Sequence, residues 1–391
     1  MALGGAERAL LGLLNALDTE KVDVDLFINQ HTGEFMPLIP SKINLLPELK
    51  GYNAIERPMK DILKEGQFGV LYGRLKAKWQ HYKYIKTLDE KKRMFDASGL
   101  QYIADSISPY LEPLFFLGEY DLAISFLQPH NIVLNKVKAK QKIAWIHTDY
   151  SAVHFNAEKE LPVWSKFDKI VSISPECTNA FLKMFPTLKD KIIEIENILS
   201  PIFVRQQANI SDAYHMNVFD GVKLLSVGRI CHAKNYDNIP YIANKIKQSG
   251  LKFKWYIIGP GNHTVIDSLL NDLDCNDVVE FLGAKSNPYP YMKACDIYIQ
   301  PSRYEGKSVT VREAQMLCKP VIITNYATAK SQINHEVDGI IVPMDNDSIS
   351  KGIVDFNENI TLKNNIIDYL KCHDYGNENE INKIYKMINN P

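Results

Sequence analysis

From about residue 221 onward the chain alternates short apolar strands with amphipathic helices in a regular order. The segments VKLLSV and FKWYII are nearly continuous apolar runs, and a helical pattern closed by Gly250 lies between them. Strands look like this when helices cover both faces of a parallel sheet. The pattern predicts strands at 222–227, 253–258, 278–281, 296–300 and 320–324, and helices at 264–272, 289–295 and 308–318. We therefore expect a doubly wound α/β domain here.

A chain of 391 residues exceeds one ordinary core, so we expect a second domain of the same kind at the N-terminus. Helical patterns occur at 7–17, about 58–109 and 176–185, and strand patterns at 22–28, 121–126, 142–147, 168–173 and 192–197. The predicted domains are 1–199 and 200–375, with a C-terminal helix at 376–391 that packs back on the first domain. Ligands bind beyond the carboxyl ends of parallel strands, so two such sheets facing each other are expected to form a cleft.

Composition narrows the possible functions. The formal net charge is −1 and the pI is about 6.8, which argues against a general nucleic-acid binder. No apolar run approaches the roughly 20 residues that a membrane helix needs. The N-terminus reaches Glu7 and Arg8 before any long apolar stretch, so we expect no signal peptide. Six scattered cysteines, without a CxxC pair or clustered histidines, indicate reduced thiols in a cytoplasmic protein and no metal site.

The segment SRYEGKSVTVREAQMLCKP contains the most informative pair of residues, Glu305 and Glu313. Glu305 lies in the loop that leaves the predicted strand DIYIQ, and Glu313 lies about one turn inside the helix that Ser308 begins. The free N–H groups around Lys307, Ser308 and Val309 would attract an anion, while the two carboxylates would accept hydrogen bonds from hydroxyl groups. A phosphate beside hydroxyls describes a nucleotide-sugar. Acidic residues near a helix N-terminus also simply complement the helix dipole, and this alternative stays open.

Further candidate residues follow other predicted strands. Arg229 and Lys234 stand in the loop VGRICHAKN, where two cations could neutralise a leaving diphosphate without a metal ion; solvated surface cations are the alternative. Gly4 and Gly5 precede a helix, so backbone amides could approach a phosphate closely, although a simple turn has the same composition. Gly259 in IIGPGN indicates a tight turn at a strand end. The chain has no GxGxxG motif, which disfavours a dinucleotide oxidoreductase.

Together these motifs resemble the retaining glycosyltransferases of family 4, the group 1 glycosyltransferases of polysaccharide biosynthesis. The paired-glutamate signature of that family usually reads EGF-G-L-x-x-x-E-A-M-A-x-G-x-P-V, and here it stands as EGKSVTVREAQMLCKPVIIT. Lys307 replaces the usual Phe, Ser308 the usual Gly, and Cys318 and Lys319 replace a small residue and a Gly. These departures concern the local shape of the loop.

The resemblance implies the GT-B fold, in which two Rossmann-like domains face a cleft, and it adds candidate residues. His147 closes the strand KIAWIH, where the family has a histidine that contacts the transferred sugar. Leu282 in VEFLG matches the segment whose backbone reads the nucleobase, and GGAER resembles the loop near the donor pyrophosphate. The likeness is diffuse over residues 1–200 and specific over 222–345.

The function implied by the resemblance is transfer of a hexose, with retention and without a metal ion. The donor would be a nucleotide diphosphate sugar, expected to be UDP-linked, and the acceptor a growing, lipid-linked bacterial surface polysaccharide. The expected catalytic residues are His147, Arg229, Lys234 and Glu305, while Glu313 would hold the ribose hydroxyls; no cofactor is expected. Two alternatives stay open: a GT-B epimerase of UDP-sugars, and a non-catalytic sugar-nucleotide-binding partner.

The beginning of the chain departs from the family pattern. The family has a strand before its glycine loop, yet only three residues precede Gly4 here. Whether the N-terminal domain lacks its first strand is left open; such a loss would place a gap in the middle of its sheet.

One further segment bears on where the protein works. Between Tyr72 and Met94, eight Lys and Arg residues stand against only Asp89 and Glu90, with aromatic residues interleaved. The segment reads as a basic helix with an aromatic side, which either covers the N-terminal sheet or meets an anionic membrane surface. Because a polyprenyl-diphosphate-linked acceptor would lie at such a surface, we expect a peripheral enzyme at the inner face of the cell membrane.

Overall fold

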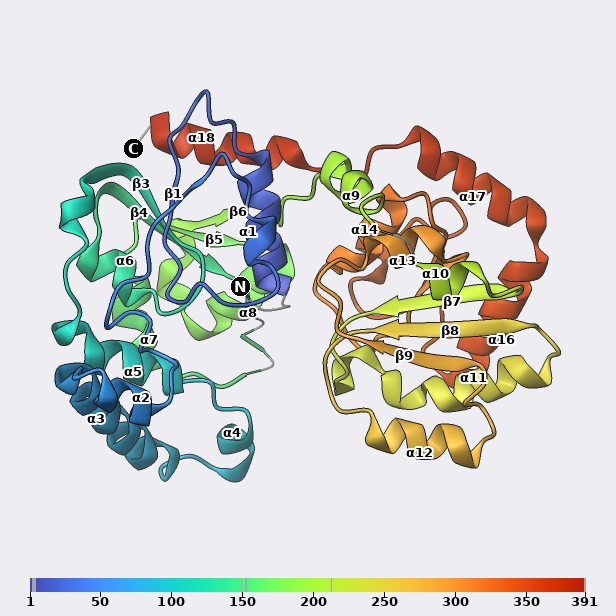
Figure 1. Cartoon of the computed structure of the whole chain (residues 1–391), viewed down its shortest axis with the longest axis horizontal. Helices are drawn as coiled ribbons and strands as arrows, with labels where there is room; N and C mark the ends of the chain where they lie inside the picture. The colour runs from blue at the N-terminus through green and yellow to red at the C-terminus, as the bar shows by residue number, and fades with distance from the viewer. Residues whose placement is uncertain (2–4, 149, 152, 212, 390–391) are drawn as a thin grey trace. The chain divides into compact units, whose positions relative to one another are not determined.

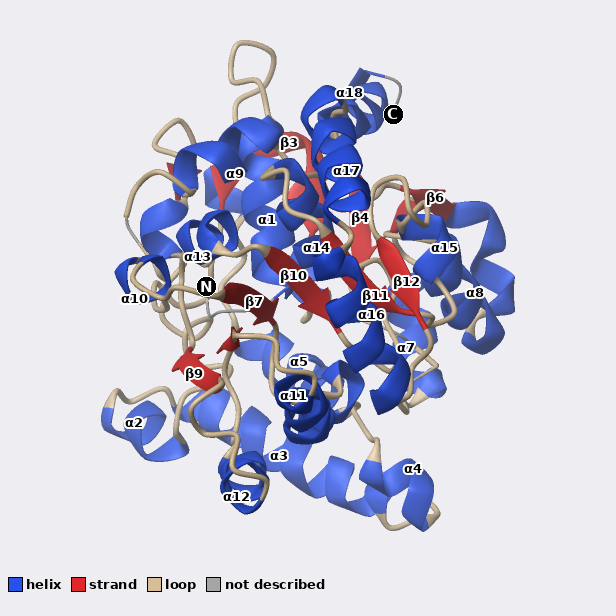
Figure 2. Ribbon diagram, turned by 90° about the vertical axis from the view of Figure 1, so that its right-hand side faces the viewer, coloured by secondary structure: helices blue, strands red, loops and turns tan. Residues whose placement is uncertain are grey.

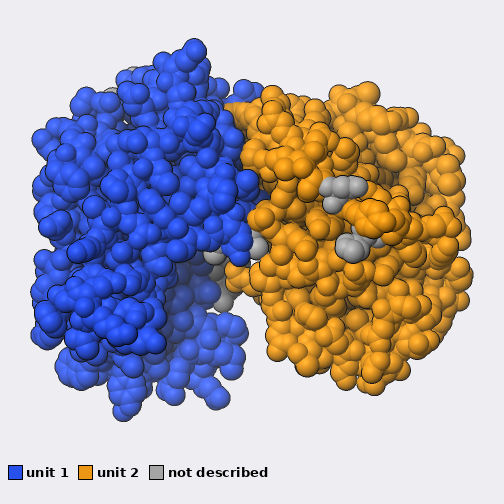
Figure 3. All heavy atoms as spheres, in the orientation of Figure 1, with its two compact units in different colours: residues 1–198, 379–391 blue, residues 199–378 orange. Residues whose placement is uncertain are grey.

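The computed structural model describes residues 1, 5–148, 150–151, 153–211 and 213–389 (Figure 1). The chain forms two compact units, coloured separately in Figure 3. Unit 1 comprises Met1–Ile198 and Asn379–Pro391, and unit 2 comprises Leu199–Glu378. Among the described residues, no helix is both long and apolar enough to cross a membrane.

Unit 2 is built on one six-stranded parallel sheet with the order β12-β11-β10-β7-β8-β9. Figure 2 shows β7, β10, β11 and β12 running side by side. The strands are β7 Val222–Val227, β8 Phe253–Ile258, β9 Val279–Gly283, β10 Ile297–Gln300, β11 Val321–Thr324 and β12 Ile340–Val342. The predicted doubly wound α/β class is confirmed, and β12 is the strand that the sequence pattern missed.

Both faces of this sheet are covered by helices. On β8, Trp255 and Ile257 enter one core while Tyr256 and Ile258 enter the other, which explains the nearly continuous apolar run in the sequence. The first core is closed by α11 Ile239–Gln248, α12 Thr264–Asp272, α16 Asn346–Glu358 and α17 Ile360–Cys372. The second is closed by α9 Pro201–Gln207, α10 Tyr214–Asn217, α13 Tyr289–Ala294, α14 Val309–Met316 and α15 Ala329–Gln332.

Unit 1 has two separate parallel sheets. The larger has the order β3-β4-β5-β6, with β3 Glu119–Ser125, β4 Lys138–Ile146, β5 Lys169–Ser172 and β6 Ile192–Glu194. The smaller pairs β1 Asp25–Leu26 with β2 Asn44–Leu45. The helices are α1 Gly5–Ala16, α2 Met59–Lys64, α3 Phe68–Ile85, α4 Glu90–Met94, α5 Gly99–Ile107, α6 Asn131–Lys136, α7 Ala157–Trp164, α8 Pro175–Met184 and α18 Ile381–Asn389.

A gap between β1 and β3 divides the sheet of unit 1. No described residue before α1 forms a strand, and β1 and β3 are not paired by their backbones. They are linked instead by a side chain, since the Tyr120 hydroxyl donates to Asp25 Oδ2 at 2.6 Å. Among the described residues, the strands of unit 1 are therefore divided between two sheets.

The C-terminal helix α18 belongs to unit 1. Its Ile381, Ile384 and Met387 pack into the same core as Leu13 and Leu14 of α1. The backbone N–H of Asp18 also donates to the hydroxyl of Tyr385 at 2.8 Å. The helices α1 and α18, far apart in the sequence, therefore contribute to the same core.

Candidate functional site

The predicted site residues of unit 2 gather where its strand order reverses. β7 and β10 are neighbours at the centre of the sheet, and the chain proceeds outward from them in opposite directions. The loops leaving their carboxyl ends cover 228–235 and 301–308. In open α/β sheets this switch point is where ligands bind, because the two loops separate there.

The two loops are joined by an ion pair between Lys234 and Glu305. The Lys234 ammonium lies 2.6 Å from Glu305 Oε1, and the side chains are only 19% and 13% exposed. Sequence analysis predicted both residues as ligand contacts but not their contact with each other. With Lys234 held in this way, its charge is placed at the switch point rather than left to a mobile surface side chain.

Three donors converge on the same carboxylate oxygen of Glu305. Besides Lys234, Gln300 Nε2 donates to Oε1 at 2.8 Å and Ser302 Oγ donates to it at 2.6 Å. Gln300 in turn accepts from the Tyr298 hydroxyl at 2.8 Å. Glu305 Oε2 has no hydrogen-bond partner among the described residues, so the second oxygen remains available to accept from a ligand hydroxyl.

An arginine clamps the two loops from the outer side. Arg303 forms a two-pronged ion pair with Asp237, with N–O distances of 2.8 and 2.6 Å. Its guanidinium also donates to the carbonyl of His232 at 2.7 Å, and its backbone N–H donates to the carbonyl of Ala233 at 2.8 Å. Bidentate Arg–carboxylate pairs fix geometry as well as charge. The sequence did not reveal this clamp, because Arg303 and Asp237 stand 66 positions apart and no pattern links them.

Gly259 brings the loop after β8 against the loop after β7. A Cβ at Gly259 would lie 1.9 Å from the carbonyl oxygen of Gly228, so only glycine fits. The loops continue the sheet pairing, because Gly228 N–H donates to Ile258 O at 2.8 Å and Ile230 N–H donates to Pro260 O at 2.9 Å. Gly259 therefore supports the loop that carries Arg229 and Lys234.

The helix α14 begins as predicted, but its first N–H groups are already partly used. Ser308 is the N-cap by backbone position, yet its hydroxyl makes no capping bond. Its N–H donates to Gln332 Oε1 at 3.3 Å, and Gln332 Nε2 donates back to the Ser308 carbonyl at 2.5 Å. A ligand approaching Lys307–Val309 would thus meet a loop braced by Gln332 from α15.

Glu313 lies in the second turn of α14 and is fully buried. Its Oε1 accepts a hydrogen bond from the Tyr289 hydroxyl at 2.7 Å. Burial raises the pKa of Tyr298, and the nearby Glu313 and Glu305 carboxylates raise it further. Tyr298 and Glu305 are linked through Gln300, since Gln300 accepts from the Tyr298 hydroxyl and donates to Glu305 Oε1.

The remaining predicted residues of unit 2 are less enclosed. Arg229 is exposed and has no hydrogen-bond or ion-pair partner in the part of the chain that the structure describes. Lys307 is half-buried in the loop before α14. Leu282 lies in β9 and packs partly against the core. Among the described residues, no carboxylate pairs with Arg229.

Three predicted residues fall in the N-terminal part of the chain. Gly5 is the exposed first residue of α1, and Gly4 lies outside the described residues. His147 directly follows β4, with its ring centroid 4.3 Å from that of Phe126 and its plane within 6° of Trp145. Its Nε2 is buried without a hydrogen-bond partner among the described residues. Burial lowers the pKa of His147 to about 4, so its imidazole is neutral at pH 7.

Beneath His147, unit 1 contains a buried polar cluster that sequence analysis did not find. Glu160 is completely buried; Trp164 Nε1 donates to its Oε2 at 2.9 Å, and Gln128 Nε2 lies 3.4 Å from its Oε1. Burial raises the pKa of Glu160 to about 7. Burial, and then the neighbouring His147, lower the pKa of His130 to about 3. Burial in this cluster therefore favours the uncharged forms of Glu160 and His130.

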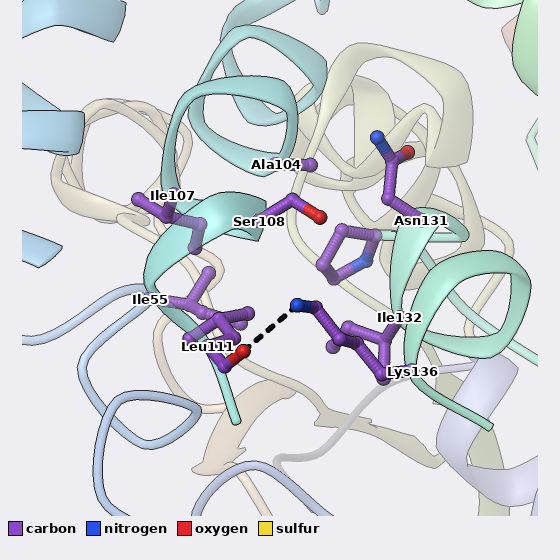
Figure 4. A pocket seen from close by; sticks show the side chains of 9 residues that line it. Ile55, Ala104, Ile107, Ser108, Leu111, Asn131, Ile132 and Lys136 are labelled. Carbon is purple, nitrogen blue, oxygen red and sulfur yellow. Dashed lines mark hydrogen bonds between the residues drawn. The ribbon is translucent and has the colours of Figure 1, made fainter. Parts of the chain in front are cut away.

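A small pocket in unit 1 lies apart from the predicted site residues. Figure 4 shows it between Ile55, Ile107, Asn131 and Lys136, with the Lys136 ammonium donating to the Leu111 carbonyl at 2.8 Å. Burial lowers the pKa of Lys136. Over the described residues, no group of three or more His, Cys, Asp or Glu side chains is arranged to hold a metal ion.

The chain is similar in sequence to known glycosyltransferases. Residues 219–372 match the family described as glycosyl transferases group 1. The O-antigen biosynthesis glycosyltransferase WclY of Escherichia coli is 27% identical over 42% of this chain and 45% of its own length. The N,N'-diacetylbacillosaminyl-diphospho-undecaprenol alpha-1,3-N-acetylgalactosaminyltransferase of Campylobacter jejuni is 22% identical over 48% of this chain and 49% of its own. The chain spans half or less of the first curated relatives that it matches, namely 50%, 37% and 32% of their lengths.

A solved structure matches the whole chain in fold. The crystal structure of Anabaena HepE in complex with UDP-glucose superposes with a TM-score of 0.66 and 14% identity, covering 99% of this chain and 96% of that protein. At this identity the likeness concerns the fold alone. The predicted GT-B fold class is confirmed.

The close approach of Gly259 to Gly228 leads to a stability prediction. We expect Gly259→Ala to lower the free energy of unfolding of unit 2 by about 2 kcal/mol or more, because the added methyl group must displace a backbone carbonyl. Gly306→Ala is the control, since a Cβ there meets nothing within 4 Å. Chemical denaturation of the two variants measures the difference, and equal midpoints would contradict the assignment.

The buried carboxyl of Glu160 leads to a pH-dependent prediction. Its pKa is raised from 4.5 to about 7 by folding, so the folded state binds the extra proton between these values and loses stability as pH rises through them. The lowered pKa values of His130 and His147 act in the opposite direction, removing stability as pH falls below 6.5.

Glu160→Gln should therefore gain stability relative to the wild type between pH 5 and pH 8, by on the order of 1 kcal/mol or more. Thermal unfolding at both pH values measures this gain. Glu158→Gln, an exposed position on the same helix, is the control and should show a constant difference. A constant difference for Glu160→Gln as well would show that folding does not raise the pKa of this carboxyl.

Proposed function

Because residues 219–372 belong to the group 1 glycosyl transferase family, we propose that this chain is a retaining glycosyltransferase. It moves a hexose from a UDP-sugar to a growing, lipid-linked bacterial surface polysaccharide. The observation that carries the proposal is the pairing of Lys234 with Glu305 at the switch point of unit 2. A cation and a carboxylate with one open oxygen, held side by side, suit a donor that carries both a diphosphate and sugar hydroxyls.

In this proposal the leaving diphosphate is stabilised by protein cations and needs neither a metal ion nor a cofactor. Arg229 is exposed and unpaired among the described residues, so its charge can meet the diphosphate directly. Lys234 adds a second charge once the diphosphate shares it with Glu305. The backbone around Lys307, Ser308 and Val309 contributes the positive end of α14. Gly4 and Gly5 are proposed to approach the same phosphates.

The sugar and the nucleoside are bound by the two glutamates. Glu305 Oε2 would accept hydrogen bonds from hydroxyl groups of the hexose, because Oε1 is already occupied by three donors. Glu313 would bind the ribose hydroxyls, with Tyr289 orienting its carboxylate, and the backbone of Leu282 would contact the base. His147, neutral at pH 7, would lie near the reacting face of the sugar. No protein nucleophile is assigned, so attack on the donor from its front face is the proposed route to retention.

The acceptor is proposed to be a saccharide linked to a polyprenyl diphosphate. The name of the Campylobacter jejuni relative states that it acts on such a lipid-linked sugar. This chemistry would place the protein at the inner, cytoplasmic face of the cell membrane, against an anionic lipid surface. Its formal charge of −1 gives no support to nucleic acid as a partner.

One incubation separates this proposal from its alternatives. The purified protein is given UDP-glucose or UDP-galactose, and the products are analysed by chromatography and NMR. A transferase releases UDP slowly by transfer to water, an epimerase returns a UDP-sugar inverted at C2, and a non-catalytic partner only binds. Glu160, the strongly perturbed carboxyl of unit 1, is fully buried and offers no exposed acid or base to an epimerase. Epimerisation, or binding without turnover, would overturn the proposal.

The division of labour between the two glutamates can be tested by binding. Glu313→Gln should weaken UDP binding about tenfold or more, because a hydrogen bond to a charged group is worth roughly 1.5–3 kcal/mol. Glu305→Gln should keep the affinity for UDP while lowering turnover of UDP-sugar. Isothermal titration measures the affinities, and thermal unfolding shows that each variant is folded. Unchanged UDP affinity in Glu313→Gln would contradict the role given to the ribose contact.

The role of the cations can be tested by kinetics. Arg229→Ala should reduce kcat on the order of 10²-fold without loss of stability, because its exposed side chain meets only the developing charge. Lys252→Ala, at the amino-terminal edge of the same sheet, is the control and should leave kcat unchanged. EDTA should have no effect on either protein. Activity that disappears with chelator and returns with manganese would contradict the metal-independent mechanism.

A further inference from the structure

The helix α3 is oriented with its small residues inward and its large apolar residues outward. The buried positions are Val70, Gly73 and Ala77. Five large apolar side chains are more than half exposed: Phe68 66%, Tyr72 59%, Leu75 51%, Trp79 57% and Tyr82 56%. Leu71, Tyr84 and Ile85 are half-buried. A surface helix of a globular protein normally buries its large apolar side chains, so packing within unit 1 does not account for this arrangement.

Close packing against the neighbouring segments forces this orientation. A Cβ at Gly73 would lie 2.7 Å from the carbonyl oxygen of Ser106, and one at Gly69 would lie 2.7 Å from the Tyr110 ring. α3 packs mainly against α5, α2 and the short helix Ser108–Tyr110. Figure 1 shows α2 and α5 beside it. At positions 69 and 73 there is therefore room only for glycine, which brings this face of α3 close to its neighbours.

The five outward side chains form one stripe, which we call the apolar stripe. They follow one another at intervals of four, three, four and three residues, so they lie on one side of the helix. At 1.5 Å per residue the stripe is about 21 Å long. Tyr110, itself 45% exposed, packs edge-on against Tyr72 with ring centroids 6.2 Å apart and widens the stripe at one end.

Lysines accompany the apolar stripe along its length. α3 contains Arg74, Lys76, Lys78 and Lys83 and no acidic residue. The ammonium of Lys83 lies 3.5 Å from the centre of the Trp79 ring, and that of Lys86 lies 4.5 Å from the centre of the Tyr82 ring. Only Arg74 turns inward, where it donates to the carbonyls of Ala54 and Arg57. The face therefore offers apolar side chains with cations immediately beside them.

The charges decide between the possible partners of this face. A second copy of the chain would bring two all-cationic helices together, which their repulsion opposes. For a single-stranded nucleic acid, bases would have to stack on Trp79 and Tyr82, yet a lysine covers a face of each ring. The interface of an anionic bilayer fits both components, because aromatic rings lie at the headgroup level and lysines contact lipid phosphates.

We propose that α3 is a membrane-docking helix that inserts its apolar stripe into the headgroup region of an anionic bilayer. The inference deepens the proposed function, on which it rests for the bacterial membrane as the partner surface. It differs from attraction by charge alone, because the stripe supplies apolar burial while Lys76, Lys78, Lys83 and Lys86 select anionic lipid. The binding surface is thus a defined line of side chains rather than the general charge of the segment.

Trp79 provides a built-in probe for this docking. The chain has four tryptophans, and the other three, Trp145, Trp164 and Trp255, are at most 3% exposed. The full-length protein is mixed with vesicles of phosphatidylcholine, with or without phosphatidylglycerol. We expect co-sedimentation with the vesicles that contain phosphatidylglycerol and a blue shift of tryptophan emission, since only Trp79 passes from water into the lipid interface.

Two variants separate the stripe from the charge. Phe68→Ser/Leu75→Ser keeps Trp79 and every lysine, and should lower partitioning onto anionic vesicles about tenfold or more. Lys76→Glu/Lys78→Glu should remove the preference for anionic over neutral vesicles. Ile360→Ser, which removes an exposed apolar side chain of unit 2, is the control and should bind as the wild type does. All substituted side chains are exposed, and thermal unfolding confirms that the variants are folded.

Several results would overturn the proposal. These are equal vesicle binding by wild type and Phe68→Ser/Leu75→Ser, an emission maximum unmoved by anionic vesicles, or quenching by polyuridylate without vesicle binding. A dimer in light scattering that the stripe variant dissociates would also overturn it, by assigning the face to a second copy. Release of UDP from UDP-glucose, measured without vesicles, is scored separately. Loss of docking with UDP release intact refutes only this inference, and docking without UDP release refutes only the proposed function.

Discussion

A single carboxylate oxygen, Glu305 Oε1, connects the segments that make up the candidate site. It accepts from Lys234 in the loop after β7, from Gln300 at the end of β10 and from Ser302 in its own loop. Three donors on one oxygen fix the carboxylate so that the other oxygen is left for a ligand. The same interaction requires a glycine at position 228, because a Cβ at Gly228 would lie only 2.9 Å from the Lys234 side chain. Gly259 and the ion pair between Arg303 and Asp237 support the loops after β7 and β10 that this interaction joins.

The strands that carry this site could be predicted from the sequence, because a strand buried on both faces of a sheet appears as a continuous run of apolar residues. Continuous apolar runs marked five of the six strands of unit 2, and the paired glutamates marked the loop after β10. The pairing of Lys234 with Glu305 could not be predicted, since periodicity reports which face a residue occupies and not which side chain it meets 71 positions away. Gln300 did leave a signal, a polar residue ending an apolar strand. Tyr289 left no signal in the sequence, because a tyrosine at the start of a short helix is common and does not indicate a contact with Glu313.

The helix α3 shows a different limit of sequence reasoning. Its interleaved aromatic and basic residues indicated two sides, but the pattern did not say which side faces inward. The alternative in which the aromatic side faces the protein interior is wrong for Tyr72, Trp79 and Tyr82, which are more than half exposed. Tyr84 does turn inward, where its hydroxyl lies 2.9 Å from His154 Nε2. Steric room decided the matter: the carbonyl of Ser106 leaves space only for Gly73. A glycine in a helix usually weakens it, and here it is the residue that permits close packing.

The divided sheet of unit 1 shows how the N-terminal half is held together without a strand between β1 and β3. Backbone pairing is absent there among the described residues, so the connection must come from side chains. Leu13 and Leu14 of α1 share one core with Ile43 next to β2, and with Ile143 and Trp145 of β4. α1 therefore bridges both sheets, and α18 packs against the same core. Gly5 begins α1, and His147 directly follows β4, with its ring stacked parallel to that of Trp145. The two described candidate residues of unit 1 are therefore positioned by elements that this core holds together.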